Sequence, residues 1–492
     1  MKLGIRLRIG FALASAVMFV VLAQAPAAAP QSIAGAAAAH SEVVAGVQGN
    51  PAPLDQQASP RSSFAQMAVS VAHTINVGKD PEDILYAPSS HEIYVADYGA
   101  KNVSVINGTT YKVVRTISVG TEGNPESLLY NPSNREVYVV LDTGSGSPNG
   151  SIVVIDTTTN KVVTTVHVNG TGSHAGPILL AYDPANGDTY ALSDVQTSSP
   201  PYYSVSYLSK IGNTSNAVTS IKVDPSAINV IYDNATQCLV VAGFETSNLT
   251  VVNSTTNSVR TVHLGNVLEP NFMVYNSADK DVDVVDFGTS SRRGPNITGD
   301  VSVLAPTNKV VATIKVGMSP NPFINPVDPV NHDLYVVNTN QTGNKGTYGN
   351  TTVSIISTSN KVVATVKVGK GAFVAQYDPA NGDVYVESPL TNRTYVIGGT
   401  TNKLVGSPTI SKGYPYFPLF DPGTGDMLVA GESTFADSSS TAKTVVAVFS
   451  SANQLLVNLT LGEGPISSAT YDPEDSGMFA TNYGAGTVSV IL

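Results

Sequence analysis

The sequence contains one cysteine, Cys238, and no tryptophan. A single cysteine excludes an internal disulfide, a multi-cysteine metal site, an iron–sulfur cluster and a CxxCH haem attachment. Charged residues are also scarce, at 13% of the chain, whereas glycine (42 residues) and proline (30 residues) are frequent. This composition is typical of short strands joined by turns, and it disfavours long solvated helices.

The net charge of the 492-residue chain is acidic, with a formal value of −11. The first 27 residues carry Lys2, Arg6 and Arg8 and no acid, so without them the balance is 23 − 37 = −14. Nucleic-acid binding depends on a basic face. We therefore expect no nucleic-acid partner. Hydrophobic residues make up 42% of the chain, which is enough for a large core.

The N-terminus has the pattern of a secretory signal. A short basic segment precedes an apolar run over 9–23 and a stretch of small residues. We expect residues 1–27 to be a signal peptide cleaved after Ala27 or Ala28; an uncleaved N-terminal anchor is the alternative. Residues 28–66 are rich in Ala, Pro, Ser and Gln and are predicted to be a flexible linker. No second long apolar run follows, so no membrane span is expected after signal removal, and a secreted or surface-associated protein is predicted.

One pattern recurs through residues 67–492, most clearly over 368–405. Four short apolar runs are separated by turns, the first at Tyr377-Asp378-Pro379 with Asn381-Gly382 after it. Similar triplets recur at Tyr182-Asp183-Pro184 and Tyr471-Asp472-Pro473. An Asn-Lys turn recurs before the fourth run of several units. Nine units are recognised, starting near residues 78, 120, 170, 224, 265, 317, 369, 413 and 462.

A repeat of about 40–50 residues with four strands per unit indicates a β-propeller. The expected fold is all-β, a single closed propeller of about nine four-stranded blades, with seven or eight as the alternatives if a degenerate unit is misread. The last unit ends at Leu492 without a fourth strand, and residues 68–78 match that missing strand. We therefore expect the N-terminal strand to complete the last blade and close the ring.

The second strand of the units reads Tyr94-Val95-Ala96-Asp97, Tyr335-Val336-Val337-Asn338 and Phe479-Ala480-Thr481-Asn482. With third and fourth strands such as 352–369, this resembles the YVTN-repeat β-propeller family of secreted and surface-layer proteins. The resemblance covers almost all of 68–492. It implies the fold and, more often than a defined reaction, an extracellular binding or cell-surface role.

No catalytic constellation stands out in the sequence. There is no HExxH or other tight metal spacing, no nucleophile elbow, no phosphate loop and no dinucleotide fingerprint. No catalytic residue and no cofactor are predicted. Asp283 is the exception to the pattern, because it occupies the tyrosine position of the second strand in the fifth unit. A carboxylate there indicates either an irregular, partly exposed blade or a weak candidate for a cation site.

Five connections between second and third strands are unusually long. In a four-stranded blade these connections open on the same face as the blade-to-blade connections, so we predict that this face binds a partner. The candidate partner-binding residues are its large side chains, Tyr202, Tyr203, Arg292, Arg293 and Tyr348. The alternative is neutral loop insertion. The long connections are 142–150, 194–202, 286–300, 338–350 and 432–443.

Asn-x-Ser/Thr acceptors exceed what the Ser and Thr content alone would produce, which favours a glycosylated surface protein. Turn-rich composition is the alternative explanation. The thirteen candidates are Asn102, Asn107, Asn149, Asn169, Asn213, Asn234, Asn248, Asn253, Asn296, Asn340, Asn350, Asn392 and Asn458.

Together these features favour a non-catalytic binding, scaffold or envelope protein whose partner is a protein or another envelope component. The alternatives are a secreted propeller enzyme, of the metal-dependent lactonase or lyase kind, and a carrier of a small ligand or metal in the central channel. An enzyme would need carboxylates or histidines that project into the channel from several blades. The sequence does not place such a set, so an enzyme is the less favoured reading.

Overall fold

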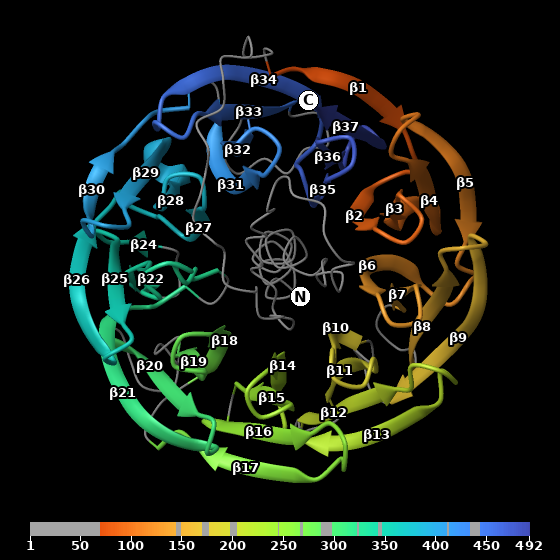
Figure 1. Ribbon diagram of the computed structural model, residues 1–492, viewed down its shortest axis with the longest axis horizontal. Coiled ribbons are helices and arrows are strands. Elements are labelled where there is room, and N and C mark those ends of the chain that lie inside the picture. The colour runs from red at the N-terminus through yellow and green to blue at the C-terminus, as the bar shows by residue number, and fades with distance from the viewer. Residues whose placement is uncertain are drawn as a thin grey trace, which may run out of the picture.

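The computed structural model describes residues 69–143, 149–169, 177–196, 204–244, 246–265, 269–286, 298–321, 324–342, 347–410, 413–432 and 443–492. These residues form nine antiparallel blades arranged in a ring (Figure 1). The predicted all-β propeller and its nine blades are confirmed. The predicted signal peptide (1–27) and linker (28–66) lie outside the described residues.

Each blade runs from an innermost strand near the ring axis to an outermost strand at its edge (Figure 1). Blade 1 contains β2 (Pro81–Ala87), β3 (Glu92–Asp97), β4 (Asn102–Asn107) and β5 (Lys112–Ser118). Blade 2 contains β6 (Asn124–Asn131), β7 (Glu136–Asp142), β8 (Asn149–Asp156) and β9 (Lys161–Asn169). Blade 3 contains β10 (Pro177–Tyr182), β11 (Thr189–Gln196), β12 (Ser204–Ile211) and β13 (Val218–Val223). Blades 4 and 5 contain β14 (Ala227–Asp233), β15 (Cys238–Gly243), β16 (Asn248–Asn253) and β17 (Val259–His263); and β18 (Pro270–Asn276), β19 (Asp281–Asp286), β20 (Thr298–Ala305) and β21 (Lys309–Met318).

The remaining blades follow the same plan with two variations. Blade 6 contains β22 (Leu334–Asn338), β25 (Thr352–Ser357) and β26 (Lys361–Lys367), with a small hairpin of β23 (Gln341–Thr342) and β24 (Thr347–Tyr348). Blade 7 contains β27 (Val374–Asp378), β28 (Asp383–Ser388), β29 (Arg393–Gly398) and β30 (Lys403–Gly406). Blade 8 contains β31 (Tyr414–Asp421), β32 (Asp426–Glu432), β33 (Lys443–Phe449) and β34 (Leu455–Glu463). Blade 9 contains β35 (Ala469–Asp472), β36 (Gly477–Asn482), β37 (Thr487–Ile491) and β1 (Val71–Asn76). Two single-turn 3-10 helices, η1 (Tyr98–Ala100) and η2 (Pro389–Thr391), join second and third strands.

Blade 6 departs from the plan in its innermost segment. That segment pairs with β22 only through isolated bridges, Pro320 with Asn338 and Val327 with Leu334. Pro320, Pro326 and Pro329 fall in or beside it. Proline has no N–H to donate to a ladder, which explains why continuous pairing fails here.

The ring closes through β1, as predicted from residues 68–78. This strand pairs antiparallel with β37, from Val71 opposite Ile491 to Asn76 opposite Thr487. The first and last strands of the described chain, β1 and β37, therefore share one blade (Figure 1). Closure buries the two blade faces that an open array would leave exposed on its first and last blades.

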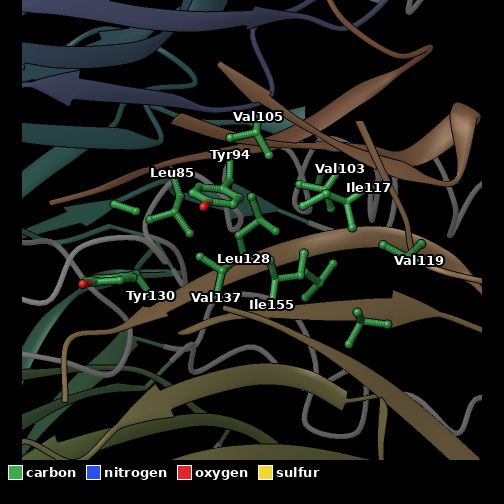
Figure 2. Close-up of a cluster of buried hydrophobic side chains, with 14 of the residues drawn as sticks. Leu85, Tyr94, Val103, Val105, Ile117, Val119, Leu128, Tyr130, Val137 and Ile155 are labelled. Atoms are coloured by element: carbon green, nitrogen blue, oxygen red, sulfur yellow. The ribbon is translucent and has the colours of Figure 1, made fainter. Parts of the chain in front are cut away.

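The core lies between blades. One cluster joins Leu85, Tyr94 and Val103 of blade 1 to Leu128 and Ile155 of blade 2 (Figure 2). Equivalent clusters recur at the other blade boundaries. Burying one such side chain stabilises the fold by about 1.5–3 kcal/mol. A lone blade would expose these faces, so stacking in a ring makes the repeat stable.

In four blades the tyrosine of the second strand lies at the blade boundary, next to the turn that precedes the outermost strand of the next blade. Its hydroxyl donates a hydrogen bond to the turn asparagine of the next blade. These turn asparagines adopt positive φ, between 52° and 60°. The pairs are Tyr94 with Asn160, Tyr138 with Asn216, Tyr335 with Asn402 and Tyr385 with Asn453.

The polar residue that ends the second strand joins it to a serine of the third strand. Asn482 Nδ2 donates to Ser489 Oγ at 2.9 Å, and Ser104 Oγ donates to Asp97 Oδ2 at 2.6 Å. A Cβ added at Gly462 would lie 2.9 Å from Asn482 Cγ, and one at Gly78 would lie 2.5 Å from Asp97 Cγ. At Gly78 and Gly462 the glycine that opens the unit is therefore required by this close approach, whereas the equivalent Gly120 and Gly265 have no such neighbour and adopt positive φ instead.

Candidate functional site

One face of the ring carries the long connections between second and third strands. Strand bounds place these connections after β7, β11, β19, β22 and β32, in blades 2, 3, 5, 6 and 8. In the other four blades the same connection is short, as between Asp97 and Asn102. The second strands all end on this side of the ring, which is called the long-loop face below. The opposite side, the turn face, carries the short turns that follow first and third strands.

The structure describes little of the five connections themselves. Tyr202, Tyr203, Arg292 and Arg293 lie outside the described residues. The backbone of Tyr348 lies in β24, which pairs with β23 through Gln341. The placement of these candidate partner-binding residues together on one binding surface therefore stays a prediction.

The innermost strands reach the same face through a β-bulge. In blades 1, 2, 3, 4, 5 and 8, one residue at the start of the strand has no partner on the second strand. Bulges re-aim side chains and are frequent near functional sites. In blade 1 the bulged residue is Glu82, between Pro81 opposite Asp97 and Asp83 opposite Ala96. The other bulged residues are Glu126, Ile178, Ile228, Asn271 and Tyr416.

Two neighbouring bulges are acidic. The pKa of Glu82 is raised to about 7, mainly by burial and in addition by the charges of Asp83 and Asp80. Burial raises the pKa of Glu126 to about 8, with additional repulsion from Asp142 and from Glu82. The charge of Glu82 therefore acts on Glu126, and burial favours the neutral form of both carboxyl groups.

A hydroxyl borders this acidic pair. Tyr98, in η1, donates a hydrogen bond to Asp142 Oδ2 at 2.6 Å and so joins blade 1 to the end of β7 in blade 2. The set of Glu82, Glu126, Asp142 and Tyr98 is called the acidic mouth below. Its sequence signal is the dipeptide Pro-Glu at the start of the first two units, which the sequence analysis did not single out.

Asp83 lies beside the acidic mouth but has a structural role. It is fully buried and accepts hydrogen bonds from Ile84 N, Leu128 N and Ser468 Oγ at 2.7–2.9 Å. These partners belong to blades 1, 2 and 9. Burial raises the pKa of Asp83 to about 7 against the opposing effect of these bonds. The residue therefore ties the ring together at its closure.

Asp283 lies in a regular strand, opposite Val274 on one side and Val303 on the other. Its side chain is 5% exposed, so the interpretation of an irregular, partly exposed blade is wrong. The pKa of Asp283 is raised to about 8, mainly by burial and in addition by the charges of Asp279 and Asp281. In the described ranges, no three His, Cys, Asp or Glu side chains are grouped so that they could hold a metal ion.

Of the histidines with described side chains, His167 and His263 lie near strand ends, and His91 and His332 lie in turns. His167 lies 3.2 Å from Ser151 Oγ and 3.7 Å from Glu122 through its Nδ1 atom, and His263 Nδ1 lies 2.7 Å from Asn248 Oδ1. His73 is exposed on β1 and stacks on Tyr111 with ring centroids 4.2 Å apart. His174 lies outside the described residues.

The candidate glycosylation acceptors are accessible wherever their side chains are described. Asn350 is exposed, and none of the others is buried. Three of them use the amide nitrogen in a hydrogen bond to a backbone oxygen, namely Asn102, Asn340 and Asn392. The partly exposed set is Asn102, Asn107, Asn213, Asn234, Asn248, Asn253, Asn340, Asn392 and Asn458, whereas the side chains of Asn149, Asn169 and Asn296 lie outside the described part.

In the described part of the chain, no helix has both the length and the apolar character needed to cross a membrane.

Comparison with known proteins supports the fold. No protein-family model matches the chain, and no curated protein matches it in sequence. Among solved structures, dihydro-haem d1 dehydrogenase NirN in complex with DHE is similar with a TM-score of 0.53 and 14% identity, over 83% of this chain and 82% of NirN. The Dos1 propeller is similar with a TM-score of 0.53 and 12% identity, over 86% of this chain and 94% of that one. At such identities the likeness shows a shared β-propeller fold.

Proposed function

We propose that this protein is a secreted or cell-surface propeller with YVTN-type blades that acts as a non-catalytic binding or scaffold component of the cell envelope. Its partner, a protein or another envelope component, docks on the long-loop face. The secretory pattern of residues 1–27 and the accessible glycosylation acceptors support the location.

The observation that carries this proposal is the difference between the two faces. On the turn face, the connections are short and their polar side chains are engaged in bonds between blades, as in Tyr335 with Asn402. On the long-loop face, five connections extend well beyond what blade geometry needs. Loops held by a rigid scaffold are where binding residues concentrate.

The test compares a loop-shortened variant with a turn-face control of unchanged length, both in the host that makes the protein. In the first, residues 287–297 and 433–442 are each replaced by Tyr-Gly-Ala-Gly, the short connection that blade 9 uses at 483–486. In the control, the turn-face residues Thr157-Thr158-Thr159 are replaced by Gly-Thr-Thr, which precedes the turn asparagine of blade 7. We expect the first variant to fold but to leave the envelope fraction for the medium, and the control to remain. Retention of both variants would contradict docking through this face.

Intact mass and elemental analysis of the protein from its host test the location directly. The proposal predicts a chain cut near Ala27 that is heavier than its sequence because of glycans. An uncut, unmodified chain would contradict it. Asp283→Asn should leave the metal content unchanged.

The acidic mouth favours a second candidate function, an enzyme or a carrier of a small ligand or metal near the ring axis. Carboxyl groups with pKa values of about 7 and 8 are suited to proton transfer or cation binding. One structural neighbour, dihydro-haem d1 dehydrogenase NirN, is a dehydrogenase whose structure contains DHE. A stoichiometric metal or cofactor that is lost in Glu82→Gln/Glu126→Gln would favour this candidate over the first.

A further inference from the structure

The outer edge of the ring carries a regular second set of β-bulges. In six blades, the outermost strand has one extra residue near its start, after its second pair with the third strand in five blades and after its first pair in blade 8. In blade 5, for example, Val310 lies opposite Leu304 and Ala312 opposite Val303, which leaves Val311 unpaired. Every extra residue is aliphatic. They are Val114, Val163, Val311, Val363, Val405 and Leu456.

These bulged side chains are exposed. The five valines are between 51% and 55% accessible, and Leu456 is 39% accessible. Water contact makes an aliphatic side chain less favourable than a polar one at such a site. The bulge also disrupts the ladder at the free edge and so discourages pairing with a strand of another chain. A partner on this edge would therefore contact side chains and not extend the sheet.

The outermost strands are basic although the protein is acidic. The nine strands β1, β5, β9, β13, β17, β21, β26, β30 and β34 contain ten Lys or Arg residues and one acid, Glu463. The whole chain has 26 basic and 37 acidic residues, so opposite charges are separated between edge and interior. The ten are Lys112, Arg115, Lys161, Lys222, Arg260, Lys309, Lys315, Lys361, Lys367 and Lys403.

The outermost strands of three adjacent blades, blades 5 to 7, all carry lysines and no acidic residue. Strands β21, β26 and β30 follow one another along the ring edge (Figure 1) and contain five lysines and no acid. No glycosylation acceptor lies in these strands or in the turns before them. Lys315 pairs with Asp300 at 2.8 Å. The other four, Lys309, Lys361, Lys367 and Lys403, are exposed, and within the described ranges none has a carboxylate within ion-pair distance.

We propose that this rim sector, made of Lys309, Lys361, Lys367 and Lys403 with Val311, Val363 and Val405, binds an acidic polysaccharide. Carboxylate groups of the polymer pair with the lysines, and the C–H faces of its sugar rings contact the exposed valines. The surface lies on the ring edge, apart from the long-loop face, so it is a second binding surface and not a restatement of the first.

The shape of the edge selects this partner over two others. A flexible linear polymer can follow a convex edge and meet the repeated lysines in turn. A flat bilayer would touch such an edge only tangentially. A second copy that contacted the sector edge to edge would oppose lysine with lysine, which repels. A linear polyanion is therefore the occupant that the charge and the curvature favour together.

The experiment measures binding of the full-length protein to immobilised polygalacturonate, with neutral dextran as the reference surface. We expect binding to polygalacturonate only, weakening as ionic strength rises because the contacts are charged and exposed. Lys309→Gln/Lys361→Gln/Lys403→Gln should weaken binding about tenfold or more, by analogy with the salt-dependent loss of phosphate contacts. Val311→Thr/Val363→Thr/Val405→Thr keeps the charge and the β-branched shape and should weaken binding about threefold.

A matched control separates the rim sector from net charge. Lys79→Gln/Lys370→Gln/Lys443→Gln removes the same charge from three exposed lysines outside the outermost strands and should leave affinity within about twofold. Equal weakening by the control, or equal binding to dextran, would overturn the proposal. So would preferential binding to vesicles of phosphatidylcholine and phosphatidylglycerol, or self-association in sedimentation that the lysine substitutions abolish. None of these outcomes depends on whether the long loops bind an envelope component.

Discussion

The hydroxyl of Tyr385 donates a hydrogen bond to Asn453 Oδ1 at 2.6 Å, across the boundary between blades 7 and 8 and over 68 residues of sequence. Asn453 Nδ2 in turn donates to Asp383 Oδ2 at 2.7 Å, and Asn381 Nδ2 donates to Asn453 Oδ1 at 3.1 Å, so one turn asparagine engages three residues of the preceding blade. The repeated tyrosine and the repeated asparagine are thus two halves of a contact between blades.

Tyr385→Phe should lower the free energy of unfolding by about 1 kcal/mol, because it removes one hydrogen bond between blades while Asn453 Oδ1 still accepts the bond from Asn381 Nδ2. Asn453→Gly keeps the positive φ but removes all three side-chain bonds, including the one from Tyr385, so the double variant should cost less than the sum of the single variants. Denaturant titration measures all three. Tyr395→Phe, whose hydroxyl reaches only Thr391 of its own blade at 3.5 Å, is the control and should cost less than about 0.5 kcal/mol. If the losses of unfolding free energy in the two single variants simply added up in the double variant, the contact between Tyr385 and Asn453 would be contradicted.

The buried carboxyl of Asp283 should make stability fall as pH rises. Its pKa is raised from 3.8 to about 8 in the folded state, so between these values the folded chain binds more protons than the unfolded chain. The cost of ionisation is therefore absent below about pH 4 and complete above about pH 8. Asp283→Asn should reduce the total fall in the free energy of unfolding between about pH 4 and about pH 8 by about 2 kcal/mol or more, measured by denaturant titration across this range. Glu463→Gln, at an exposed position, should leave the slope unchanged, and an unchanged slope in Asp283→Asn would contradict the assignment.

Gly78 should resist substitution although its backbone is ordinary. A Cβ there would lie 2.5 Å from both Cβ and Cγ of Asp97, which no rotamer of Asp97 relieves. Gly78→Ala should therefore destabilise the protein by about 1–3 kcal/mol in a thermal or denaturant melt. At Gly406 the nearest atom to an added Cβ is 3.8 Å away, so Gly406→Ala should be neutral or slightly stabilising. Equal effects of the two substitutions would contradict the packing argument.

The fold was predictable because its signals are local and repeated. Turn triplets such as Tyr377-Asp378-Pro379 mark hairpins within a few residues, and the strand missing after Leu492 matches residues 68–78. The acidic mouth and the rim sector were not predictable in this way. A bulge at Glu82 or Val311 is a one-residue shift in pairing with another strand, which an amphipathic pattern does not record. The bond between Ser468 and Asp83 spans 385 residues, so only the closed ring brings its partners together.

Ring closure depends on a strand that buries little. Ile75 is the only fully buried side chain of β1, and it packs in one cluster with Ile84 of blade 1 and Val488 and Val490 of blade 9. Ile75→Ala should lower the free energy of unfolding by about 2 kcal/mol, because it leaves a cavity in this closing cluster. Thr74→Ala, one residue away on the exposed side, should change it by less than about 0.5 kcal/mol. Because β1 joins both ends of the chain, the loss should appear in a single transition that tyrosine fluorescence and far-UV circular dichroism report at the same denaturant concentration. A separate early transition in Ile75→Ala would show instead that blade 9 opens on its own and that the ring does not depend on its closure.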